Sequence, residues 1–239
     1  MKLSVVVPAF NEERLLPGTL HQIRAALDAV ASSGFCAELI VCDNNSTDRT
    51  AEIARAAGAR VVFEPVNQIA RARNAGAKVA SGDWLLFVDA DSSPSPELVL
   101  NMLAAIESAS CVGGGATVQL PGAPLPVRAW VGAWNLLSRM ARWAAGSFLF
   151  AEAAAFRAIG GFSEELYAAE EIDFSRRLKA RFPDRRFVIL HRHPLVTSGR
   201  KAELYTPREH LTFLWRMATR GRRALTSREA CSVWYDGRR

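Results

Sequence analysis

The sequence has few cysteines and no long apolar run, and both absences exclude whole classes of protein. Its four cysteines stand far apart without a Cys-x-x-Cys pair, which excludes a disulfide framework and the common kinds of zinc site. No apolar run reaches the length of about 18 residues that a membrane-spanning helix needs. The first apolar run, at 3–10, is too short for the core of a signal peptide and leads directly into Asn11-Glu12-Glu13. We therefore expect a cytoplasmic protein.

Acidic residues are scarce near the end of the chain, although the net charge of the whole is only +6. From Arg176 onwards there are 17 Lys and Arg against 5 Asp and Glu. Such a basic region suits a phosphorylated substrate, nucleic acid or the anionic face of a membrane. No nucleic-acid-binding motif accompanies it. We therefore expect no nucleic acid as a partner, and a weak, peripheral contact with the inner face of an anionic membrane.

Strands and helices alternate over roughly the first 110 residues. The predicted strands are short apolar or β-branched runs at 3–8, 38–42, 60–64 and Trp84–Val88. Helices with apolar residues at helical spacing are predicted between them, at 15–30, 50–57 and Ile69–Val79. This alternation predicts the α/β class, with a single doubly wound and mostly parallel sheet flanked by helices.

The second half of the chain is less regular. We expect a helix at 97–109, a strand at 111–120, a helix at Glu170–Arg181, a strand at 187–190, a polar loop at 191–205 and a helix at 209–217. The stretch 127–145 interleaves tryptophans with arginines, which suits either core packing with a groove wall or a helix at a membrane interface. One domain, 1–239, is expected, with two halves at 1–118 and 119–205 and a basic helical extension at 206–239.

Two carboxylates follow the most apolar strand. Asp89 and Asp91, separated by one alanine, come directly after Trp84–Val88. Open α/β sheets bind ligands beyond the carboxyl ends of their strands, and hard oxygen atoms suit Mg²⁺ or Mn²⁺. The two residues would equally serve to cap backbone N–H groups of the following turn. Because the polar stretches 10–13 and 43–48 also follow strands, all three would line one crevice.

Three further groups allow both a structural and a functional interpretation. Glu170 and Glu171 would form either a simple acidic first turn of a helix or part of a site. His193 follows a strand and is a candidate third metal ligand, although a surface position is more common for such a histidine. Arg200 and Lys201 lie in a basic stretch that would either fold over a diphosphate or stay solvated.

Six short segments resemble, in order, the inverting glycosyltransferases of family 2, which have the GT-A fold. Each segment alone is common, but six in family order at natural spacing are a specific signal. They lie at 5–12, 41–48, 70–76, 86–91, 159–162 and 170–174, and read VVVPAFNE, VCDNNSTD, ARARNAG, LFVDAD, IGGF and EEIDF. The resemblance therefore extends from the first predicted strand to the helix at Glu170–Arg181.

The resemblance implies a nucleotide-diphosphate sugar donor, with UDP or GDP as the nucleotide, and an acceptor with a hydroxyl group, a lipid-linked acceptor among the candidates. It places the base near Pro8 and Phe10, with Asp43 accepting the imino proton of the base. It also places Asp89 at the ribose and Asp91, the second carboxylate of the DxD motif, on a Mg²⁺ or Mn²⁺ ion that bridges the diphosphate. The remaining candidates for donor binding are Glu12, Arg71, Asn74, Arg200 and Lys201.

Two departures from the family pattern affect these assignments. Asn44-Asn45 stands where the family usually has Asp-Gly. Asn45 can take the left-handed backbone of a glycine, whereas Asn44 lacks a carboxylate and leaves the choice of nucleobase open. Glu170-Glu171 stands where the family usually has Glu-Asp. Glu171 takes the position of the catalytic base, its longer side chain being able to abstract the same proton, and Glu170 is the other candidate.

Two other functions fit parts of the sequence. A phosphohydrolase of the haloacid dehalogenase type also has Asp-x-Asp after a strand, with the first Asp as nucleophile. That signature normally opens its domain, whereas here full strand–helix units precede Asp89. A non-catalytic protein that binds nucleotide sugars is the second alternative. Nucleotidyltransferases share the layout, but their glycine-rich N-terminal loop is absent from this sequence.

Overall fold

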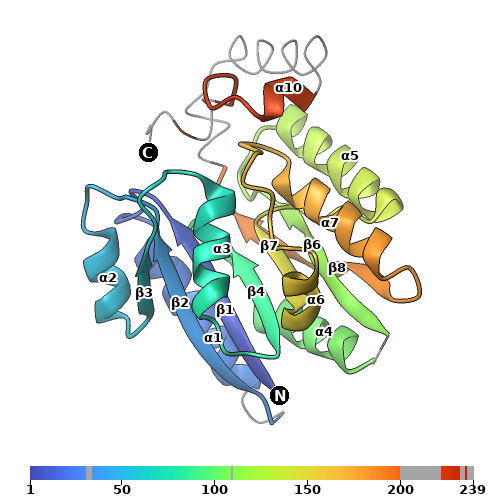
Figure 1. The fold of residues 1–239 in the computed structure, drawn as a ribbon, viewed down its shortest axis with the longest axis horizontal. Helices are drawn as coiled ribbons and strands as arrows, with labels where there is room; N and C mark the ends of the chain where they lie inside the picture. The colour runs from blue at the N-terminus through green and yellow to red at the C-terminus, as the bar shows by residue number, and fades with distance from the viewer. Residues whose placement is uncertain (31–33, 109, 200–221, 232–234, 236–239) are drawn as a thin grey trace.

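A single sheet forms the centre of the computed structural model (Figure 1). The structure describes residues 1–30, 34–108, 110–199, 222–231 and 235. Eight strands within these residues are hydrogen-bonded in the order β3-β2-β1-β4-β7-β6-β8-β5. The strands are β1 (Lys2–Ala9), β2 (Cys36–Asp43), β3 (Arg60–Phe63), β4 (Trp84–Val88), β5 (Ser92–Ser93), β6 (Cys111–Gln119), β7 (Phe148–Glu152) and β8 (Arg186–Thr197). The helices are α1 (Leu16–Val30), α2 (Thr50–Ala56), α3 (Ile69–Val79), α4 (Pro96–Glu107), α5 (Leu125–Ala141), α6 (Ala153–Ala158), α7 (Glu170–Arg181) and α10 (Arg222–Leu225).

The strand directions are parallel in the first half of the sheet and mixed in the second. β3, β2, β1 and β4 are parallel, as the alternation of strands and helices predicted. β7 pairs antiparallel with both β4 and β6, whereas β6 and β8 pair in parallel. The predicted doubly wound α/β sheet is confirmed. The sheet is also mostly parallel, as predicted, because of the eight described strands only β7 and β5 run opposite to the other six.

The predicted polar loop at 191–205 is wrong for its first part. β8 continues to Thr197, because Leu195 pairs with β6, Val196 with both β6 and β5, and Thr197 with β5. The exposed side chains at 191–193 interrupt the apolar pattern of this strand and hid its continuation in the sequence. The predicted helix at 209–217 lies outside the described residues.

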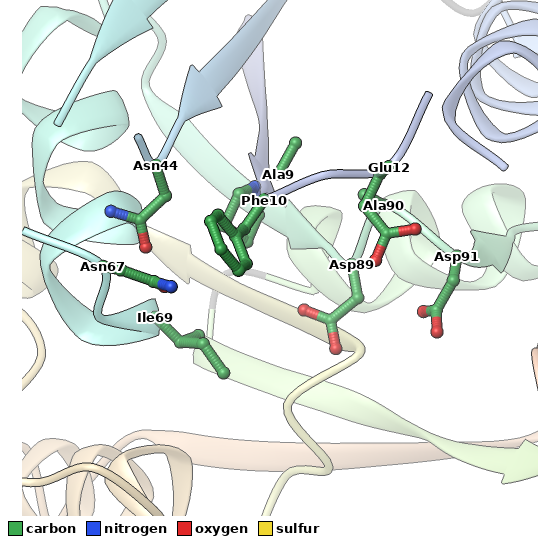
Figure 2. Close-up of a pocket in the computed structure, with 10 residues that line it drawn as sticks. Ala9, Phe10, Glu12, Asn44, Asn67, Ile69, Asp89, Ala90 and Asp91 are labelled. Atoms are coloured by element: carbon green, nitrogen blue, oxygen red, sulfur yellow. The ribbon is translucent and has the colours of Figure 1, made fainter. Parts of the chain in front are cut away.

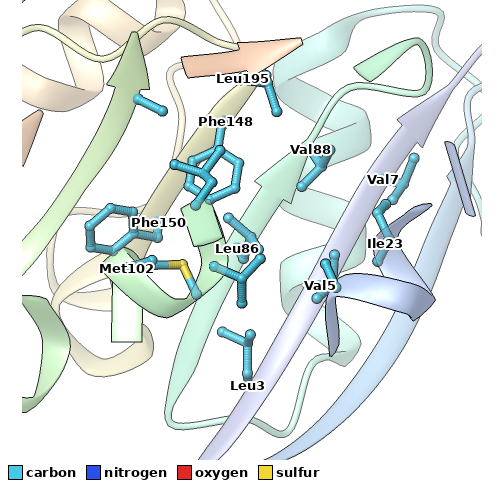
Figure 3. Close-up of a cluster of buried hydrophobic side chains, with 14 of the residues drawn as sticks. Leu3, Val5, Val7, Ile23, Leu86, Val88, Met102, Phe148, Phe150 and Leu195 are labelled. Atoms are coloured by element: carbon cyan, nitrogen blue, oxygen red, sulfur yellow. The ribbon is translucent and has the colours of Figure 1, made fainter. Parts of the chain in front are cut away.

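Alternate residues of the central strand β4 pack into two hydrophobic cores, one on each face of the sheet. Leu86 and Val88 join the core that α1 and α4 cover (Figure 3). Leu85 and Phe87 join the opposite core, beneath α3, α6 and α7. All five residues of β4 are buried, which confirms the prediction of a strand in the middle of the sheet. The carboxyl end of β4, and with it Asp89, is therefore fixed between two packed layers.

Candidate active site

The loops after β1 and β2 are fastened to each other by side chain–backbone hydrogen bonds. The backbone N–H of Asn11 donates to Oγ of Ser46 at 3.0 Å, and the N–H of Thr47 donates to Oδ1 of Asn11 at 2.8 Å. The N–H of Glu12 donates to Oγ1 of Thr50 at 2.8 Å. Because short polar side chains can hydrogen-bond backbone groups nearby, these loops need no regular structure to be rigid.

Asp43 and Asn44, at the end of β2, both hold backbone in place. Oδ1 of Asp43 accepts a hydrogen bond from the N–H of Ser46 at 3.0 Å, which closes the turn. The buried amide of Asn44 donates to the backbone oxygens of residues 64 and 66 and accepts from the N–H of Gln68 at 2.9 Å. Asn45 has a φ of 66°, so the predicted left-handed conformation is confirmed.

A small cavity of about 60 Å³ lies beyond the ends of β1 and β4 (Figure 2). Of the residues predicted to bind donor or metal, those that line it are Pro8, Phe10, Glu12, Asp89 and Asp91. Asp43 does not line it, but the neighbouring Asn44 does. The three polar loops of the sequence therefore do meet at one crevice.

A larger cavity of about 250 Å³ continues from the small one, and Ile69, Asp89 and Asp91 line both. Its far wall contains Glu170 and Glu171, at the start of α7, and the segment that precedes them. The carboxylates at the end of β4 and those of α7 therefore line the same space, although they are about 80 residues apart in the sequence.

Arg73 of α3 links the two pairs of carboxylates. Its Nη2 atom lies 3.0 Å from Oδ1 of Asp89 and 2.9 Å from the backbone oxygen of Gly146, and its Nη1 atom lies 2.8 Å from Oε1 of Glu170. Arg73 is only 2% exposed. Burial by itself lowers the pKa of Arg73, but the charges of Asp89 and Glu170 outweigh it and raise that pKa above its ordinary value. The guanidinium is therefore a permanent cation within the wall of the site.

Arg73 is not among the residues predicted from the sequence, although the sequence contains a signal for it. The helix α3 buries Ala70, Arg73 and Ala77, which are three and four positions apart and thus share one face. An arginine among alanines on the core-facing side of a helix requires carboxylate or carbonyl partners. The pattern therefore indicates a buried ion pair at this position, but not which carboxylates form it.

The two glutamates at the start of α7 have different surroundings. Glu170 is 4% exposed and is paired with Arg73, whereas Glu171 is partly buried in the cavity wall. Burial, followed by the negative charge of Glu170, raises the pKa of Glu171 well above its ordinary value. A raised pKa makes the ionised form of Glu171 a stronger base than an ordinary carboxylate.

Arg71 and Asn74, two predicted donor-binding residues, lie at a different surface. Arg71 pairs with Glu164 at 3.1 Å. Asn74 accepts from the N–H of Phe162 at 2.9 Å and donates to the backbone oxygen of Phe162 at 3.0 Å. Both line a separate open hollow of about 550 Å³ together with Gly160 and residues 162–165. Asn74 therefore holds the backbone that follows the Gly160-Gly161 turn.

His193, the candidate third metal ligand, is an exposed residue of β8 and lines neither of the two joined cavities. The described residues contain no group of three or more His, Cys, Asp or Glu with the geometry of a metal site. Arg200 and Lys201 lie outside the described residues.

The lining of the larger cavity nevertheless fits a divalent cation carried by phosphates. Among its described residues, one guanidinium, that of Arg73, faces four carboxylates, those of Asp89, Asp91, Glu170 and Glu171. This excess of negative charge favours a cationic partner in the cavity. Mg²⁺ is usually held by one or two carboxylates together with substrate phosphates, so two carboxylates at the end of β4 are a sufficient protein contribution.

The sequence profile of glycosyl transferase family 2 matches residues 4–146, which is more than half of the chain. The chain belongs to this family. A validoxylamine A glucosyltransferase of Streptomyces hygroscopicus subsp. limoneus is 37% identical over 109 residues, 43% of this chain and 23% of that protein. An uncharacterised glycosyltransferase of Mycobacterium bovis is 33% identical over 141 residues, 57% of this chain and 60% of that protein. A dolichol-phosphate mannosyltransferase of Pyrococcus furiosus is 32% identical over 123 residues, 48% of this chain and 33% of that protein. The family 2 chain thus matches at most three fifths of the length of these relatives.

Solved structures share the fold at lower sequence identity. The mannosyltransferase PcManGT from Pyrobaculum calidifontis, in complex with GDP-Man and Mn²⁺, superposes with a TM-score of 0.69 and 18% identity, over 98% of this chain and 73% of that one. Glucosyl-3-phosphoglycerate synthase from Mycobacterium tuberculosis, in complex with Mn²⁺, UDP-Glc and phosphoglyceric acid, gives 0.64 and 22%, over 97% of this chain and 80% of that one. The GT-A architecture expected for family 2 is therefore confirmed.

Proposed function

We propose that this family 2 chain is an inverting glycosyltransferase that moves a sugar from a nucleotide-diphosphate donor to a hydroxyl acceptor with the help of Mg²⁺ or Mn²⁺. The observation that carries the proposal is the single cavity lined by Asp89 and Asp91 on one side and Glu171 on the other. Family membership supports the class of reaction. Residues 1–118 would bind the donor, and residues 119–205 would form the acceptor side.

The donor would occupy both joined cavities. The nucleobase would pack against Phe10 beside Pro8. Asp43, in the turn that it closes, would accept the imino proton of the base. The diphosphate would reach Asp89 and Asp91, where the two cavities meet. The sugar would then lie in the larger cavity. Two structures of the same fold are complexes with GDP-Man and UDP-Glc, which supports this class of donor, with GDP or UDP as the nucleotide.

Asp91 would be the main protein ligand of the metal, and Asp89 would be its partner. Asp89 also accepts a hydrogen bond from Arg73, which fixes the orientation of its carboxylate. When bound, the cation would neutralise the negative charge that develops on the departing diphosphate. Arg73 keeps a positive charge next to this carboxylate in any case, and so limits the repulsion among the four acids of the cavity.

Glu171 would act as the base. In an inverting transfer, the acceptor oxygen forms a bond to the anomeric carbon while the bond from that carbon to the diphosphate oxygen breaks. The electron pair of the broken bond leaves with the diphosphate, and the hydroxyl proton passes to a carboxylate on the acceptor side. Glu171 has the raised pKa that this task needs, whereas Glu170 is engaged with Arg73. Glu170 would therefore position the wall of the site and would not take the proton.

The acceptor that we propose is a hydroxyl group on a lipid-linked molecule. One relative, the Pyrococcus mannosyltransferase, is named for dolichol phosphate. The larger cavity is partly lined by small residues, Gly146, Ala168 and Ala169, which leave room beside Glu171 for an acceptor.

The decisive experiment compares Glu171→Gln with Glu165→Gln, an exposed glutamate outside the cavity. Glu171→Gln should keep the affinity for UDP or GDP and Mn²⁺ in thermal-shift assays but lose about 10²–10⁴-fold in kcat, because a positioned base typically contributes that factor. Glu165→Gln should turn over normally. Asp91→Ala should remove the Mn²⁺-dependent part of nucleotide binding.

Each part of the proposal can be contradicted separately. If Glu171→Gln turns over as fast as the unchanged protein, Glu171 is not the base. If nucleotides bind with Mn²⁺ but no donor is consumed with any acceptor, the chain is a non-catalytic binder of nucleotide sugars. If Asp91→Ala keeps its Mn²⁺-dependent binding, the metal assignment is wrong.

A further inference from the structure

The helix α5 presents a broad apolar face to solvent. Among the described residues, nine large hydrophobic side chains are exposed, and five of them are on this one helix. They are Leu125, Trp130, Leu136, Leu137 and Met140, with exposed fractions of 76%, 66%, 57%, 46% and 75%. The comparable surface helix α4 exposes one large hydrophobic side chain, that of Leu100. Figure 1 places α5 at the outer edge of the molecule, beside α7.

The exposed face is continuous and nearly free of polar groups. At 100° per residue, its exposed positions cover about 200° of the helix circumference. Apart from Arg128 and Arg139, every exposed residue of the helix is apolar, alanine, glycine or proline. The two arginines lie eleven positions apart, which places both along the same edge of the face. Trp130 lies at the opposite edge.

The inner face of α5 is anchored, so the apolar face cannot turn inward. Val131 and Ser138 are buried, at 7% and 1% exposed. The side-chain amide of Asn135 accepts from the N–H of Val118 at 3.0 Å and donates to its carbonyl oxygen at 2.8 Å, which fastens the helix to β6. Lys179 of α7 donates to the carbonyl oxygen of Ala141, the last residue of α5.

We infer that this face of α5 docks on an anionic lipid bilayer. No Asp or Glu occurs between Glu107 and Glu152, so the helix and its surroundings in the chain carry only positive charge. A long apolar face edged by arginines on one side and a tryptophan on the other suits the boundary between headgroups and acyl chains. A second copy of the chain would bring more arginines and no carboxylate from this face. Charge therefore favours a bilayer over self-association.

The mode of attachment is interfacial. None of the described helices combines the length and the apolar character needed to pass through a bilayer. Docking on α5 would bring the reaction cavity near the lipid, since segment 142–145 joins the helix directly to Gly146 of the cavity wall. The inference itself rests on the surface of α5 and not on the chemistry of the cavity.

The test is co-sedimentation with vesicles of phosphatidylcholine, with and without phosphatidylglycerol. The unchanged protein should bind the anionic vesicles at low salt, less at high salt, and pure phosphatidylcholine weakly. Leu136→Ser with Met140→Ser should reduce the partition coefficient roughly tenfold or more, because two apolar side chains that would enter the lipid are lost. Arg128→Gln with Arg139→Gln should weaken binding to the anionic vesicles at low salt and reduce its salt dependence. Leu100→Ser on α4 and Arg55→Gln on α2 are matched controls that should bind as the unchanged protein does.

Several outcomes would overturn the inference. One is the absence of binding to anionic vesicles; another is unchanged binding by Leu136→Ser with Met140→Ser. A third is dimerisation in light scattering that this double variant abolishes without any vesicle binding, which would assign the face to a second copy. Nucleotide-induced thermal shifts check that each variant is folded, and all substituted positions are exposed.

Discussion

Arg73 replaces its contact with water by two carboxylates and one backbone oxygen, and the site depends on that replacement. A buried ion pair returns little net stability, since the cost of removing both charges from water offsets their attraction. Removal of only one partner is costly, because the other charge stays buried without compensation. Without Arg73, Glu170 would be such an uncompensated charge, because it is only 4% exposed. The guanidinium therefore has a structural function in addition to any effect on the reaction.

Arg73→Met is expected to lower the free energy of unfolding by about 3–5 kcal/mol. Arg71→Met is the matched control on the same helix. Its ion pair with Glu164 is 3.1 Å long, but the two side chains are 38% and 42% exposed, and such pairs contribute about 1 kcal/mol or less. Urea denaturation of both variants measures the difference. Equal losses would show that burial of the Arg73 pairs does not decide their contribution.

Glu171 should make stability depend on pH in a defined direction. Burial and the charge of Glu170 raise the pKa of Glu171, so the folded protein holds this proton more tightly than the unfolded chain does. The resulting stability is present below the ordinary carboxyl pKa and is lost as the pH rises through the raised one. Glu171→Gln resembles the protonated form. It should therefore be more stable than the unchanged protein at about pH 8, with a smaller gain at about pH 5.

Urea denaturation at both pH values checks this expectation, with Glu165→Gln as the exposed control, which should show no such pH-dependent gain. A gain for Glu171→Gln that is larger at the lower pH would contradict the direction of the shift. This readout does not depend on catalysis, so it also separates the electrostatics of Glu171 from its proposed part in the reaction.

At the scale of elements, the turn between β2 and α2 depends on two asparagines as much as on Asp43. Asn44 hydrogen-bonds the backbone of the loop before α3, and Asn45 is the left-handed residue of the turn. The turn positions the residues that fasten the loop after β1, including Ser46. A disturbance at Asn45 should therefore reach the small cavity through that loop.

Asn45→Ala is expected to cost about 1–2 kcal/mol of stability, because alanine is strained at the φ of 66° found there and lacks the polar side chain that lets asparagine tolerate this region. Asn45→Gly should stay within a few tenths of a kcal/mol of the unchanged protein, since glycine enters this region freely. Urea denaturation compares the two. If alanine and glycine are equally tolerated, the turn does not require a left-handed residue.

At the scale of the whole molecule, the sequence predicted those strands and helices whose pattern is set by neighbouring residues in the chain. The unbroken apolar run at Trp84–Val88 predicted a buried strand, because both faces of that strand meet a core. Strands β7 and β8 were harder to predict, since their partner strands lie far away in the sequence and the residues at 191–193 of β8 are exposed. Arg73 illustrates the same limit at the site. The spacing on α3 marks its burial, but Asp89 and Glu170 become its partners only in the folded chain.

The position of β7 between β4 and β6 also has a consequence during synthesis. β4 can join β1 early, but its other edge has no partner until Phe148 is made, 60 residues after Val88. At about 5–20 residues per second, this takes about 3–12 s on the ribosome. Throughout that time an apolar strand has one open edge, which is a template for pairing with other chains. The last strand to enter the middle of the sheet therefore sets how long the nascent protein is vulnerable to aggregation.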